Sequence, residues 1–518
     1  MPKRVTTVEL ALRQPNSGTQ LTRWLYEELR RAILDGRLLP GSRVPATRDL
    51  ARQYRVSRGT VVTAFEQLQI EGYLVSRVGG GTWVNGKLPM PLFARRRQGT
   101  SVPNLGPAVQ DLSFGQPARP FRPYEPALKE FPIHLWARVA ARRLRRFSSS
   151  MLAIGEVAGY WPLREAIAGY LSLSRGVNCS PAQVVIVSGA QQGLDLLSRT
   201  LFQPGDSVWV EDPGYFGAIA AFRTARAKIV PVPVDDQGLS VSRGQKLCRD
   251  PKAIYLTPAH QCPLGVTMSL ERRLAVLSWA HKSGASIFED DYDGEYRFEG
   301  RPIPSLQSLD RHGSVVYVGS FSKVLFPSLR IGYVVLPEKL IDPFLRVRMG
   351  ADLFPPGINQ AVLCDFIVDG HFGRHIRRMR ELYASRLAIL QDTARKYLSG
   401  LLALPQILAG LSTPSFLRNG LTSGEAEARA MACGVEAVAL SRFCLRRTDL
   451  DGLQLGFAAF DEREINQAVP TLASALEKRL VLGSPPELVY DRALSCGRRS
   501  QPAPSSTFSK TTGNLSEG

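Results

Sequence analysis

Cysteine is scarce in the 518-residue sequence, and its seven copies are scattered without a CxxC pair. An odd set of dispersed thiols argues against a disulfide scaffold and a zinc site, and it favours a cytoplasmic protein with reduced thiols. Long apolar runs are also lacking. The longest, residues 398–411, is interrupted by Pro405 and Gln406 and is shorter than the ~20 residues of a membrane span. The charged amino-terminal end has no apolar segment behind it, so we expect no signal peptide and no membrane partner.

Acidic residues are outnumbered, with 46 Asp and Glu against 65 Lys and Arg, which gives a formal net charge of +19. This basic excess fits a polyanionic partner such as nucleic acid, and a solvated basic surface explains it equally well. Residues 85–110 contain no acid, several Pro and Gly, and three arginines at 95–97, which is typical of a linker. Those arginines either contact DNA phosphates or are solvated. No Walker loop, dinucleotide fingerprint or Ser/His/Asp order stands out.

The segment before this linker has the pattern of three helices and a hairpin. Apolar residues lie on one face of residues 22–34, which Gly36 ends, and Thr47 and Ser57 are placed to cap two further short helices. Two short helices joined by a tight turn are typical of a helix-turn-helix. The stretch "GYLVSRVGGGTWVN" then alternates apolar and polar residues around a Gly turn, which predicts a β-hairpin wing.

The predicted recognition helix begins with Ser57, Arg58, Gly59 and Thr60. The first residues of such a helix enter the major groove, where Arg can donate two hydrogen bonds to guanine and hydroxyls suit phosphate. Spacing therefore favours double-stranded DNA as a partner over the alternative, a small helical core with ordinary surface arginines. Three further arginines flank this face: Arg43, Arg48 and Arg77.

The stretch "RAILDGRLLPGSRVPATRDLARQYRVSRGTVVTAFEQLQIEGYLVSRVGGGTWV" resembles the winged helix-turn-helix of the GntR regulators over nearly its whole length. The position after Arg58, commonly Thr in relatives, is Gly59, so we expect one hydroxyl contact to be absent. The resemblance implies DNA contacts by Arg48, Ser57, Arg58, Thr60 and Gly79.

The long segment after the linker alternates short apolar runs with amphipathic helical patterns, which predicts an α/β fold around a mostly parallel sheet. Two strand-like segments end in reactive groups. "ASIFED" runs into Asp290 and Tyr292, and "SVVYVGSFSK" runs into Ser320, Ser322 and Lys323. Ligands of open α/β sheets bind beyond the carboxyl ends of strands, so we expect a carboxylate and a lysine to converge there.

These groups suit a cofactor with an aldehyde, a pyridine ring and a phosphate. A buried lysine with a lowered pKa forms a Schiff base with an aldehyde, and a carboxylate at the pyridine nitrogen keeps the ring electron-withdrawing. Arg330, two serine hydroxyls and the helix start in "VSGAQQGLDLL" would hold the phosphate. Each feature alone is weak, because a strand-end "DD" is more often a loop cap and an "SK" pair usually lies on the surface.

The order of the motifs is more specific than any one of them. The chain resembles the fold type I aminotransferases, and specifically the MocR subfamily, in which a GntR-type module is fused to an aminotransferase-like domain. The resemblance covers about residues 19–482 and implies pyridoxal 5′-phosphate as the cofactor. It rests on "GYWPLREAIAGYL", "VVIVSGAQQGLDLL", "VWVEDPGYFGA", "TPAHQCPLGVTMS", "IFEDDYDGEYRF" and "VGSFSKVLFPSLRIGY", which occur in the family's order.

By position, the resemblance implies that Lys323 is the catalytic Schiff-base lysine. It places Asp290 at the pyridine nitrogen, Tyr292 at the ring hydroxyl and Tyr215 against the ring face. Arg442, in "LSRFC", is the candidate for binding an effector carboxylate. The residues implied to hold the phosphate are Gly189, Ala190, Gln191, Ser320, Ser322 and Arg330.

Several positions depart from the family pattern. Aminotransferases usually have Asn before a "PTG" turn, where it bonds the cofactor hydroxyl, but here the residue is Cys262, and Leu264 replaces the Thr. Ile154 replaces a Tyr that in many relatives reaches the partner subunit's phosphate. Gln454 occupies the place of an arginine in an "RLxFA" stretch. We expect cofactor capture to survive these changes, and they count against a full, fast transamination cycle.

We therefore expect five segments. They are an N-terminal extension (1–18), a winged helix-turn-helix (19–85), a basic linker (86–110), an aminotransferase-like domain (111–482) and a disordered tail (483–518).

The predicted function is a pyridoxal phosphate-dependent regulator of transcription that senses an amine, an amino acid or the cofactor itself. We expect a homodimer in which the subunits pair head to tail. The alternatives are an active aminotransferase with a DNA-binding appendage, and a DNA-binding protein whose large domain is only a dimerisation scaffold. His371 and His375 have a spacing that can bind a metal, but no third ligand is near, so we expect a solvated basic face and no metal.

Overall fold

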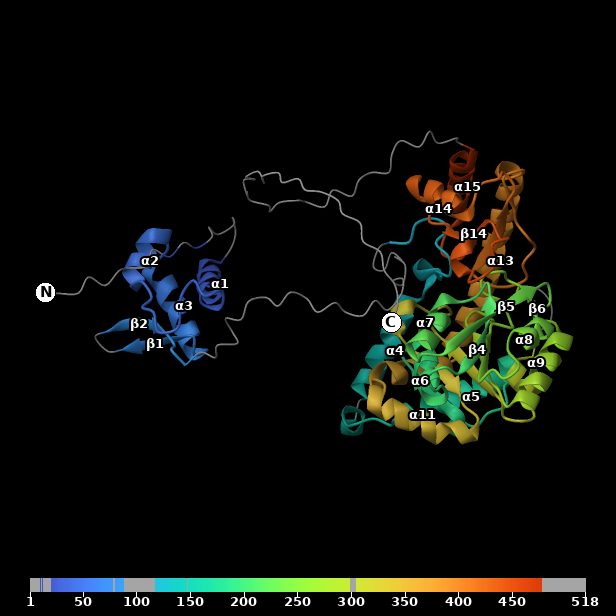
Figure 1. Ribbon diagram of the computed structural model, residues 1–518, viewed down its shortest axis with the longest axis horizontal. Helices are drawn as coiled ribbons and strands as arrows, with labels where there is room; N and C mark the ends of the chain where they lie inside the picture. The colour runs from blue at the N-terminus through green and yellow to red at the C-terminus, as the bar shows by residue number, and fades with distance from the viewer. Residues whose placement is uncertain are drawn as a thin grey trace, which may run out of the picture. The chain divides into compact units, whose positions relative to one another are not determined.

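The structure, a computed structural model, describes residues 10, 12, 20–77, 80–87, 117–146, 148–298 and 304–477. The chain divides into two compact units, Met1–Gly115 and Gln116–Gly518 (Figure 1). Every buried apolar cluster among the described residues belongs to one unit or the other, so each unit has a core of its own. Most of the predicted linker and the whole predicted tail lie outside the described residues.

The first unit is a winged helix-turn-helix. Leu25 and Leu29 pack from the first helix against Val61 and Phe65 of the third, and all four are buried. This apolar seam is the one that the spacing of the sequence predicts. The elements are α1 (Leu21–Leu34), α2 (Thr47–Tyr54), α3 (Arg58–Ile70), β1 (Leu74–Arg77) and β2 (Gly81–Val84).

Among the three helices of this unit, α3 begins with a side-chain cap, and α1 and α2 begin without one. Ser57 caps α3 as predicted, because its Oγ accepts a hydrogen bond of 3.0 Å from the N–H of Thr60. The prediction that Thr47 caps α2 is wrong. Thr47 is already helical, and the N-cap is Ala46, whose extended backbone has ψ 148° and whose side chain has no acceptor. The predicted hairpin forms, with Leu74 paired to Val84 in an antiparallel register.

The second unit contains an eight-stranded sheet in the order β3-β10-β9-β8-β7-β4-β5-β6. The central run from β9 to β5 is parallel, whereas β10 is antiparallel to both of its neighbours and β6 is antiparallel to β5. The prediction of a mostly parallel sheet is thus confirmed. The strands are β3 (Val184–Val187), β4 (Ser207–Asp212), β5 (Lys228–Asp235), β6 (Gly238–Leu239), β7 (Ala253–Leu256), β8 (Ser286–Asp291), β9 (Val315–Ser320) and β10 (Gly332–Val335).

Helices cover both faces of this sheet. Successive strand residues point to opposite sides, and apolar residues on each side pack against helices. Val185 packs with the cluster that includes α6, α7 and α11, whereas Val184 packs with α5 and α12, and Trp209 packs with α8 and α9. The helices are η2 (Leu128–Glu130), α4 (Ile133–Arg145), η3 (Ser149–Leu152), α5 (Trp161–Arg175), η4 (Pro181–Gln183), α6 (Ala190–Leu201), α7 (Phe216–Thr224), α8 (Val241–Leu247), α9 (Leu270–Ser283), α10 (Leu306–Leu309), η5 (Pro327–Leu329), α11 (Glu338–Ala351) and α12 (Gly357–Val368).

A smaller antiparallel sheet follows, in the order β11-β12-β14-β13. Leu453 and Leu455 of β14 face a core that includes α13, α14 and α15, drawn in orange and red in Figure 1. The elements are α13 (His371–Tyr397), β11 (Leu402–Ala403), β12 (Ser412–Leu417), α14 (Ser423–Ala432), β13 (Val438–Ala439), η6 (Leu440–Phe443), β14 (Gly452–Gly456) and α15 (Glu462–Glu477).

The expected solvated face around His371 and His375 is wrong for His375. This residue is 7% exposed and lies edge-on to Phe131, with ring centroids 5.6 Å apart. Its side of α13 packs on the core, and burial lowers the pKa of His375 to about 4. No group of three or more His, Cys, Asp or Glu in the described segments is arranged to hold a metal ion. No described helix combines the length and apolar character of a membrane span.

Candidate cofactor and DNA-binding sites

Lys323 lies in the turn after β9, at the carboxyl end of the parallel strands. Its Nζ donates a hydrogen bond of 2.9 Å to the carbonyl oxygen of Tyr124. Burial lowers the pKa of Lys323, because the ammonium loses water and the carboxylates of Glu125 and Asp293 offset that loss only in part. A lowered pKa increases the fraction of neutral amine, which is the form that attacks an aldehyde.

Asp290 lies at the end of the neighbouring strand β8 and is 4% exposed. The hydroxyl of Tyr255 donates to its Oδ2 at 2.8 Å, and its Oδ1 has no hydrogen-bond partner among the described residues. Burial raises the pKa of Asp290 to about 7, and the bond from Tyr255 offsets this rise only in part. A buried carboxyl oxygen without a donor is unfavourable. Oδ1 is therefore available to a protonated ring nitrogen.

Two tyrosines approach the same region from loops after β4 and β8. The hydroxyl of Tyr215 donates to Oε1 of Gln191 at 3.2 Å, and the hydroxyl of Tyr292 lies 3.2 Å from Nδ1 of His260. Burial raises the pKa of Tyr215, and the negative charge of Asp290 raises it further. Tyr215 is the N-cap of α7, which follows β4.

An anion cradle lies at the start of α6. Gly189 is the N-cap of this helix, and Ala190 and Gln191 follow as its first residues. Gly189 has φ +94°, and a side-chain carbon there would lie 3.4 Å from Nη1 of Arg330. The guanidinium therefore lies against the helix start, where free N–H groups and the helix dipole attract an anion.

The strand ends behind this cradle are packed tightly. Ser320 on β9 pairs with Gly332 on β10, and Gly332 pairs in turn with Val187 on β3. A side-chain carbon at Gly332 would lie 2.8 Å from Cα of Gly189, so glycine permits this close approach. The N–H of Ser322 donates to Oγ of Ser320 at 3.2 Å. Both serines thus lie at the edge where α6 begins.

The residues that the sequence predicts to bind the cofactor lie at this carboxyl edge of the sheet. Arg442, the predicted effector-binding residue, lies instead in η6. Its Nε lies 2.8 Å from Oε2 of Glu427, and its side chain is 41% exposed. The adjacent Phe443 faces the site instead, with its ring centroid 6.5 Å from that of Tyr124. Effector binding by Arg442 stays a prediction.

The residues that depart from the family pattern have distinct surroundings. Cys262 is buried, with Sγ 3.3 Å from the hydroxyl of Tyr124. Gln454 is 1% exposed, and its Oε1 has no partner among the described residues. Ile154 is 85% exposed in the single chain. The first two are thus internal to the large unit, and the third lies on its surface.

Sequence reasoning missed several residues of the site. Nδ1 of His260 lies 2.9 Å from Oδ2 of Asp293, and both side chains are buried. Both fall inside the quoted motifs, so motif position could have identified them. Tyr124 lies outside these motifs, so the sequence has no local signal for it. The chain next to it is held by an isolated β-bridge between Phe121 and Gly456 of the small sheet.

The residues present fit pyridoxal 5′-phosphate on two observations. The unpartnered Oδ1 of Asp290 is an acceptor of the kind that a pyridinium nitrogen requires. The start of α6 with Arg330 is a cradle of the kind that a phosphate requires. When bound, the cofactor would supply an electron sink, and Lys323 would supply the amine that joins it to the protein.

The winged unit exposes the residues predicted to contact DNA. Arg58, the first residue of α3, and Arg48 on α2 are exposed. The hydroxyls of Ser57 and Thr60 lie 2.8 Å apart. A side-chain carbon at Gly59 would meet only Oγ of Ser57, at 3.6 Å, so packing does not require glycine there.

Two more predicted DNA-binding residues gather on the wing. The guanidinium of Arg77 lies 5.3 Å from the ring centroid of Trp83. Arg43 forms an isolated β-bridge with Trp83, and a side-chain carbon at Gly81 would lie 3.0 Å from its Nε. The wing therefore presents two cations beside an indole ring. The predicted wing contact Gly79 lies outside the described residues.

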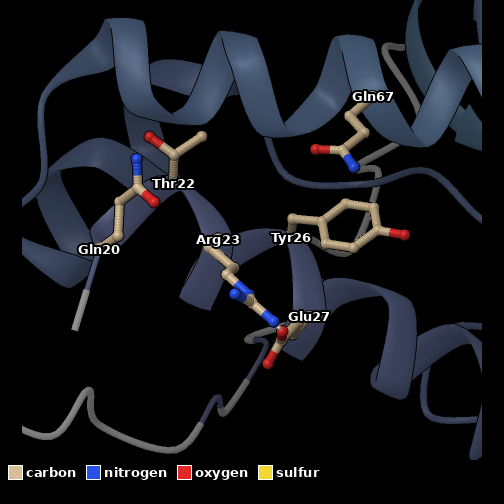
Figure 2. Close-up of a pocket in the computed structure, with 6 residues that line it drawn as sticks. All are labelled: Gln20, Thr22, Arg23, Tyr26, Glu27 and Gln67. Atoms are coloured by element: carbon tan, nitrogen blue, oxygen red, sulfur yellow. Dashed lines mark hydrogen bonds and ion pairs between the residues drawn. The ribbon is translucent and has the colours of Figure 1, made fainter. Parts of the chain in front are cut away.

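Figure 2 shows a groove on the winged unit between α1 and α3. Arg23 pairs with Glu27 at 3.0 Å, and the hydroxyl of Tyr26 donates to Glu71 at 2.6 Å. The charged side chains that line the groove, Arg23 and Glu27, therefore pair with each other, and we assign the groove no ligand. The lining residues are Gln20, Thr22, Arg23, Tyr26, Glu27 and Gln67.

Comparison with known proteins identifies the families of both units. Residues 128–402 match the family Aminotransferase class I and II, and residues 21–84 match Bacterial regulatory proteins, gntR family. The chain is 39% identical to the probable rhizopine catabolism regulatory protein MocR of Rhizobium meliloti, over 93% of this chain and 98% of that protein. It is 33% identical to the HTH-type pyridoxine biosynthesis transcriptional regulator PdxR of Corynebacterium glutamicum, over 73% of this chain and 80% of that one.

Among solved structures, the kynurenine aminotransferase of Pyrococcus horikoshii, in complex with pyridoxamine phosphate, resembles the large unit with a TM-score of 0.64. It shares 29% identity over 69% of this chain and 90% of that one. The fold and the site define a GntR helix-turn-helix joined to a fold type I aminotransferase domain, and the comparisons support pyridoxal 5′-phosphate as its cofactor. The chain belongs to the MocR subfamily of GntR transcription regulators.

Proposed function

We propose that this protein regulates transcription by binding operator DNA through its winged unit and pyridoxal 5′-phosphate through Lys323. One observation supports this most strongly: one polypeptide carries both an exposed helix start with Arg58 and a site in which the half-buried Lys323 lies near the buried carboxyl of Asp290. An enzyme needs no DNA-reading unit, and a simple repressor needs no amine with a lowered pKa.

In this proposal each site residue has one role. Lys323 joins the cofactor, Asp290 accepts a hydrogen bond from its ring nitrogen, and Tyr215 packs against its ring. Tyr292 reaches the ring hydroxyl, and Arg330 binds the phosphate with Gly189, Ala190, Gln191, Ser320 and Ser322. The role of Asp290 has the strongest support, because its buried Oδ1 lacks a hydrogen-bond partner among the described residues.

We also propose that the large unit senses an amine, an amino acid or the cofactor itself. A ligand changes DNA affinity only if it binds two conformations of the protein with different affinity. Arg442 is the candidate for an effector carboxylate, and it would then have to exchange its bond to Glu427. In this account the protein is a cytoplasmic homodimer, arranged head to tail, that binds paired half-sites on DNA.

The dimer proposal is supported by exposed apolar side chains near α4, η3 and α12. The start of α12 packs on η3, since a side-chain carbon at Gly357 would lie 3.8 Å from Cε of Met151. Apolar residues gathered on one surface are typical of protein interfaces. The exposed side chains are Ile133, Leu144, Leu152, Ile154, Leu353 and Ile358.

An active aminotransferase is the second candidate, because the pKa of Lys323 is lowered as a catalytic amine requires. Cys262 and Gln454 count against efficient turnover, since Cys262 lacks the amide and Gln454 lacks the positive charge of the family pattern at these positions. Multiple turnovers of an amino donor with a 2-oxo acid would favour the enzyme. A single half-reaction, or binding without turnover, would favour the sensor.

The cofactor part of the proposal is tested by absorbance of the purified full chain. Wild-type protein incubated with pyridoxal phosphate and desalted is expected to keep a visible band, which Lys323→Ala loses. Lys129→Ala is the matched control, because Lys129 is an exposed lysine paired with Glu464 at 2.8 Å. A colourless wild-type protein would contradict both the sensor and the enzyme.

The DNA part is tested by Arg58→Ala with operator fragments at fixed salt, found first by genomic footprinting. Loss of a bidentate contact to guanine is expected to weaken specific binding by ~1–3 kcal/mol. Arg23→Ala is the charge-matched control, because Arg23 is exposed on α1 and pairs with Glu27. Equal affinity of Arg58→Ala and wild type would overturn the assignment of α3 as the recognition helix.

A further inference from the structure

Tyr124 has an unusual backbone conformation beside Lys323. Its φ is +60°, in the left-handed region that disfavours residues with a side chain. Such outliers persist only where the surroundings fix them, and they cluster at binding sites. The contacts that fix Tyr124 therefore bear on binding at this site.

Each polar group of Tyr124 has a partner from a different element. Its N–H donates to Oγ of Ser412 on β12 at 2.8 Å, and its carbonyl oxygen accepts from Nζ of Lys323 at 2.9 Å. Its hydroxyl lies 3.3 Å from Sγ of Cys262. Three parts of the large unit therefore hold this residue in one orientation.

The ring of Tyr124 packs among aromatic residues of the site. Its centroid lies 5.9 Å from that of Tyr292 at an angle of 81°, and 6.5 Å from that of Phe443. Burial raises the pKa of Tyr124 well above its ordinary value, so the hydroxyl keeps its proton at neutral pH. Tyr124 thus presents a permanent donor between Tyr292 and Cys262.

Cys262, which lies next to this donor, departs from the family pattern of aminotransferases. A thiol is a weak hydrogen-bond donor, unlike the side-chain amide that the family pattern has at this position. Cys262 is buried, and burial raises the pKa of its thiol. It therefore offers neither a strong donor nor a charge to a bound cofactor.

We propose that the hydroxyl of Tyr124 donates a hydrogen bond to the ring hydroxyl oxygen of pyridoxal phosphate and so replaces the amide missing at Cys262. This inference rests on the proposed function, because it requires that Lys323 binds the cofactor. It assigns Tyr124 to the cofactor site, together with Tyr292, on the side of Lys323 that faces the small sheet.

The test compares Tyr124→Phe, Cys262→Asn and the double variant in the full-length protein. Tyr124→Phe keeps the ring contacts and removes only the hydroxyl. It is expected to weaken pyridoxal phosphate binding by about tenfold, the effect of one lost hydrogen bond to a charged acceptor. Adding Cys262→Asn is expected to restore the affinity to within about threefold of wild type. Tyr170→Phe is the matched control, because its hydroxyl bonds Glu295 at 3.0 Å, outside the site.

A second readout separates cofactor binding from a purely structural role. A donor to the ring oxygen favours the deprotonated form of the lysine-bound cofactor, so its loss raises the pH midpoint of the visible absorbance band. We expect this midpoint to rise in Tyr124→Phe and to return towards wild type in the double variant. A structural anchor would lower affinity or Tm without moving the midpoint, and that result would overturn the inference.

The outcomes also separate this inference from the proposed function. If wild-type protein binds no pyridoxal phosphate, the proposed function fails. If wild type binds it and Tyr124→Phe has the same affinity and midpoint, only the role of Tyr124 is wrong. If Tyr124→Phe is impaired and Cys262→Asn gives no rescue, the replacement of the amide is wrong.

Discussion

The guanidinium of Arg330 lies over Gly189, so that a side-chain carbon at Gly189 would be 3.4 Å from Nη1 of Arg330. This contact joins the loop after β9 to the start of α6. It brings one fixed cation to the free N–H groups of a helix, which is an arrangement suited to a phosphate dianion. The phosphate cradle therefore depends on glycine at one position and on arginine at the other.

Gly189→Ala is expected to destabilise the protein by about 1 kcal/mol or more, because alanine is strained at φ +94°. It is also expected to weaken cofactor binding, since relief of this backbone strain shifts the start of α6, where the phosphate is proposed to bind. Thermal unfolding with and without pyridoxal phosphate measures both effects. Gly169→Ala is the control. Gly169 is helical with no heavy atom within 4 Å of an added carbon, so alanine should leave stability unchanged or improve it. Equal behaviour of the two variants would contradict the cradle.

Asp290→Asn is expected to change the pH dependence of stability in cofactor-free protein. The pKa of Asp290 is raised from 3.8 to about 7 in the folded state. Between these values the folded state holds a proton that the unfolded state has released, so this carboxyl lowers stability as pH rises through that window. The amide does not titrate and still accepts the bond from Tyr255.

The Tm of Asp290→Asn minus that of wild type should therefore be larger at pH 8 than at pH 5. Glu211 and Glu289 are also buried with raised pKa values, about 8 and about 7, and they cancel in this difference because both proteins contain them. A difference that is the same at the two pH values would show that Asp290 does not titrate in this range.

Ser57 is expected to have separable roles in folding and in DNA binding. Ser57→Ala removes the cap of α3 and should cost about 1 kcal/mol of stability in the winged unit. Ser57→Asp keeps a capping oxygen but adds a negative charge that repels phosphate. We expect it to preserve Tm and to weaken DNA binding. If Ser57→Asp binds DNA as wild type does, the start of α3 does not approach the backbone of the duplex.

Cys262 is expected to be inert towards alkylating reagents in the native protein. Its thiol is buried, and burial raises its pKa, so little thiolate is present at neutral pH. Cys433 is exposed and is the internal control. Brief iodoacetamide treatment followed by peptide mass spectrometry should label Cys433 and leave Cys262 unmodified. Rapid labelling of Cys262 would contradict the burial and the raised pKa of its thiol.

The sequence predicts much of this fold because local signals agree with the tertiary structure. The cap at Ser57, the Gly turn of the wing and the ends of β8 and β9 are each encoded within a few residues. Thr47 is the exception, because its hydroxyl suits a cap while the backbone becomes helical at Thr47 itself. The prediction of a solvated face is wrong for His375, because a pattern of nearby arginines does not show which face of α13 is buried.

The candidate site could be predicted only where its residues lie in ordered motifs. Lys323 follows β9, and Asp290 lies at the end of the neighbouring parallel strand β8, so strand order places them together. Tyr124 belongs to no such motif, and its approach to Lys323 depends on a non-local bridge between Phe121 and Gly456. Contacts of that kind follow from the packing of the two sheets and have no local signature.

We expect Lys323 to hold pyridoxal phosphate in a DNA-binding regulator. Borohydride reduction of cofactor-loaded protein, followed by peptide mass spectrometry, tests it most directly, because reduction makes the bond between lysine and cofactor permanent. We expect one phosphopyridoxyl group per chain, on Lys323, in protein that still binds operator DNA. A protein that gains no such group, or gains it on other lysines, would contradict the account.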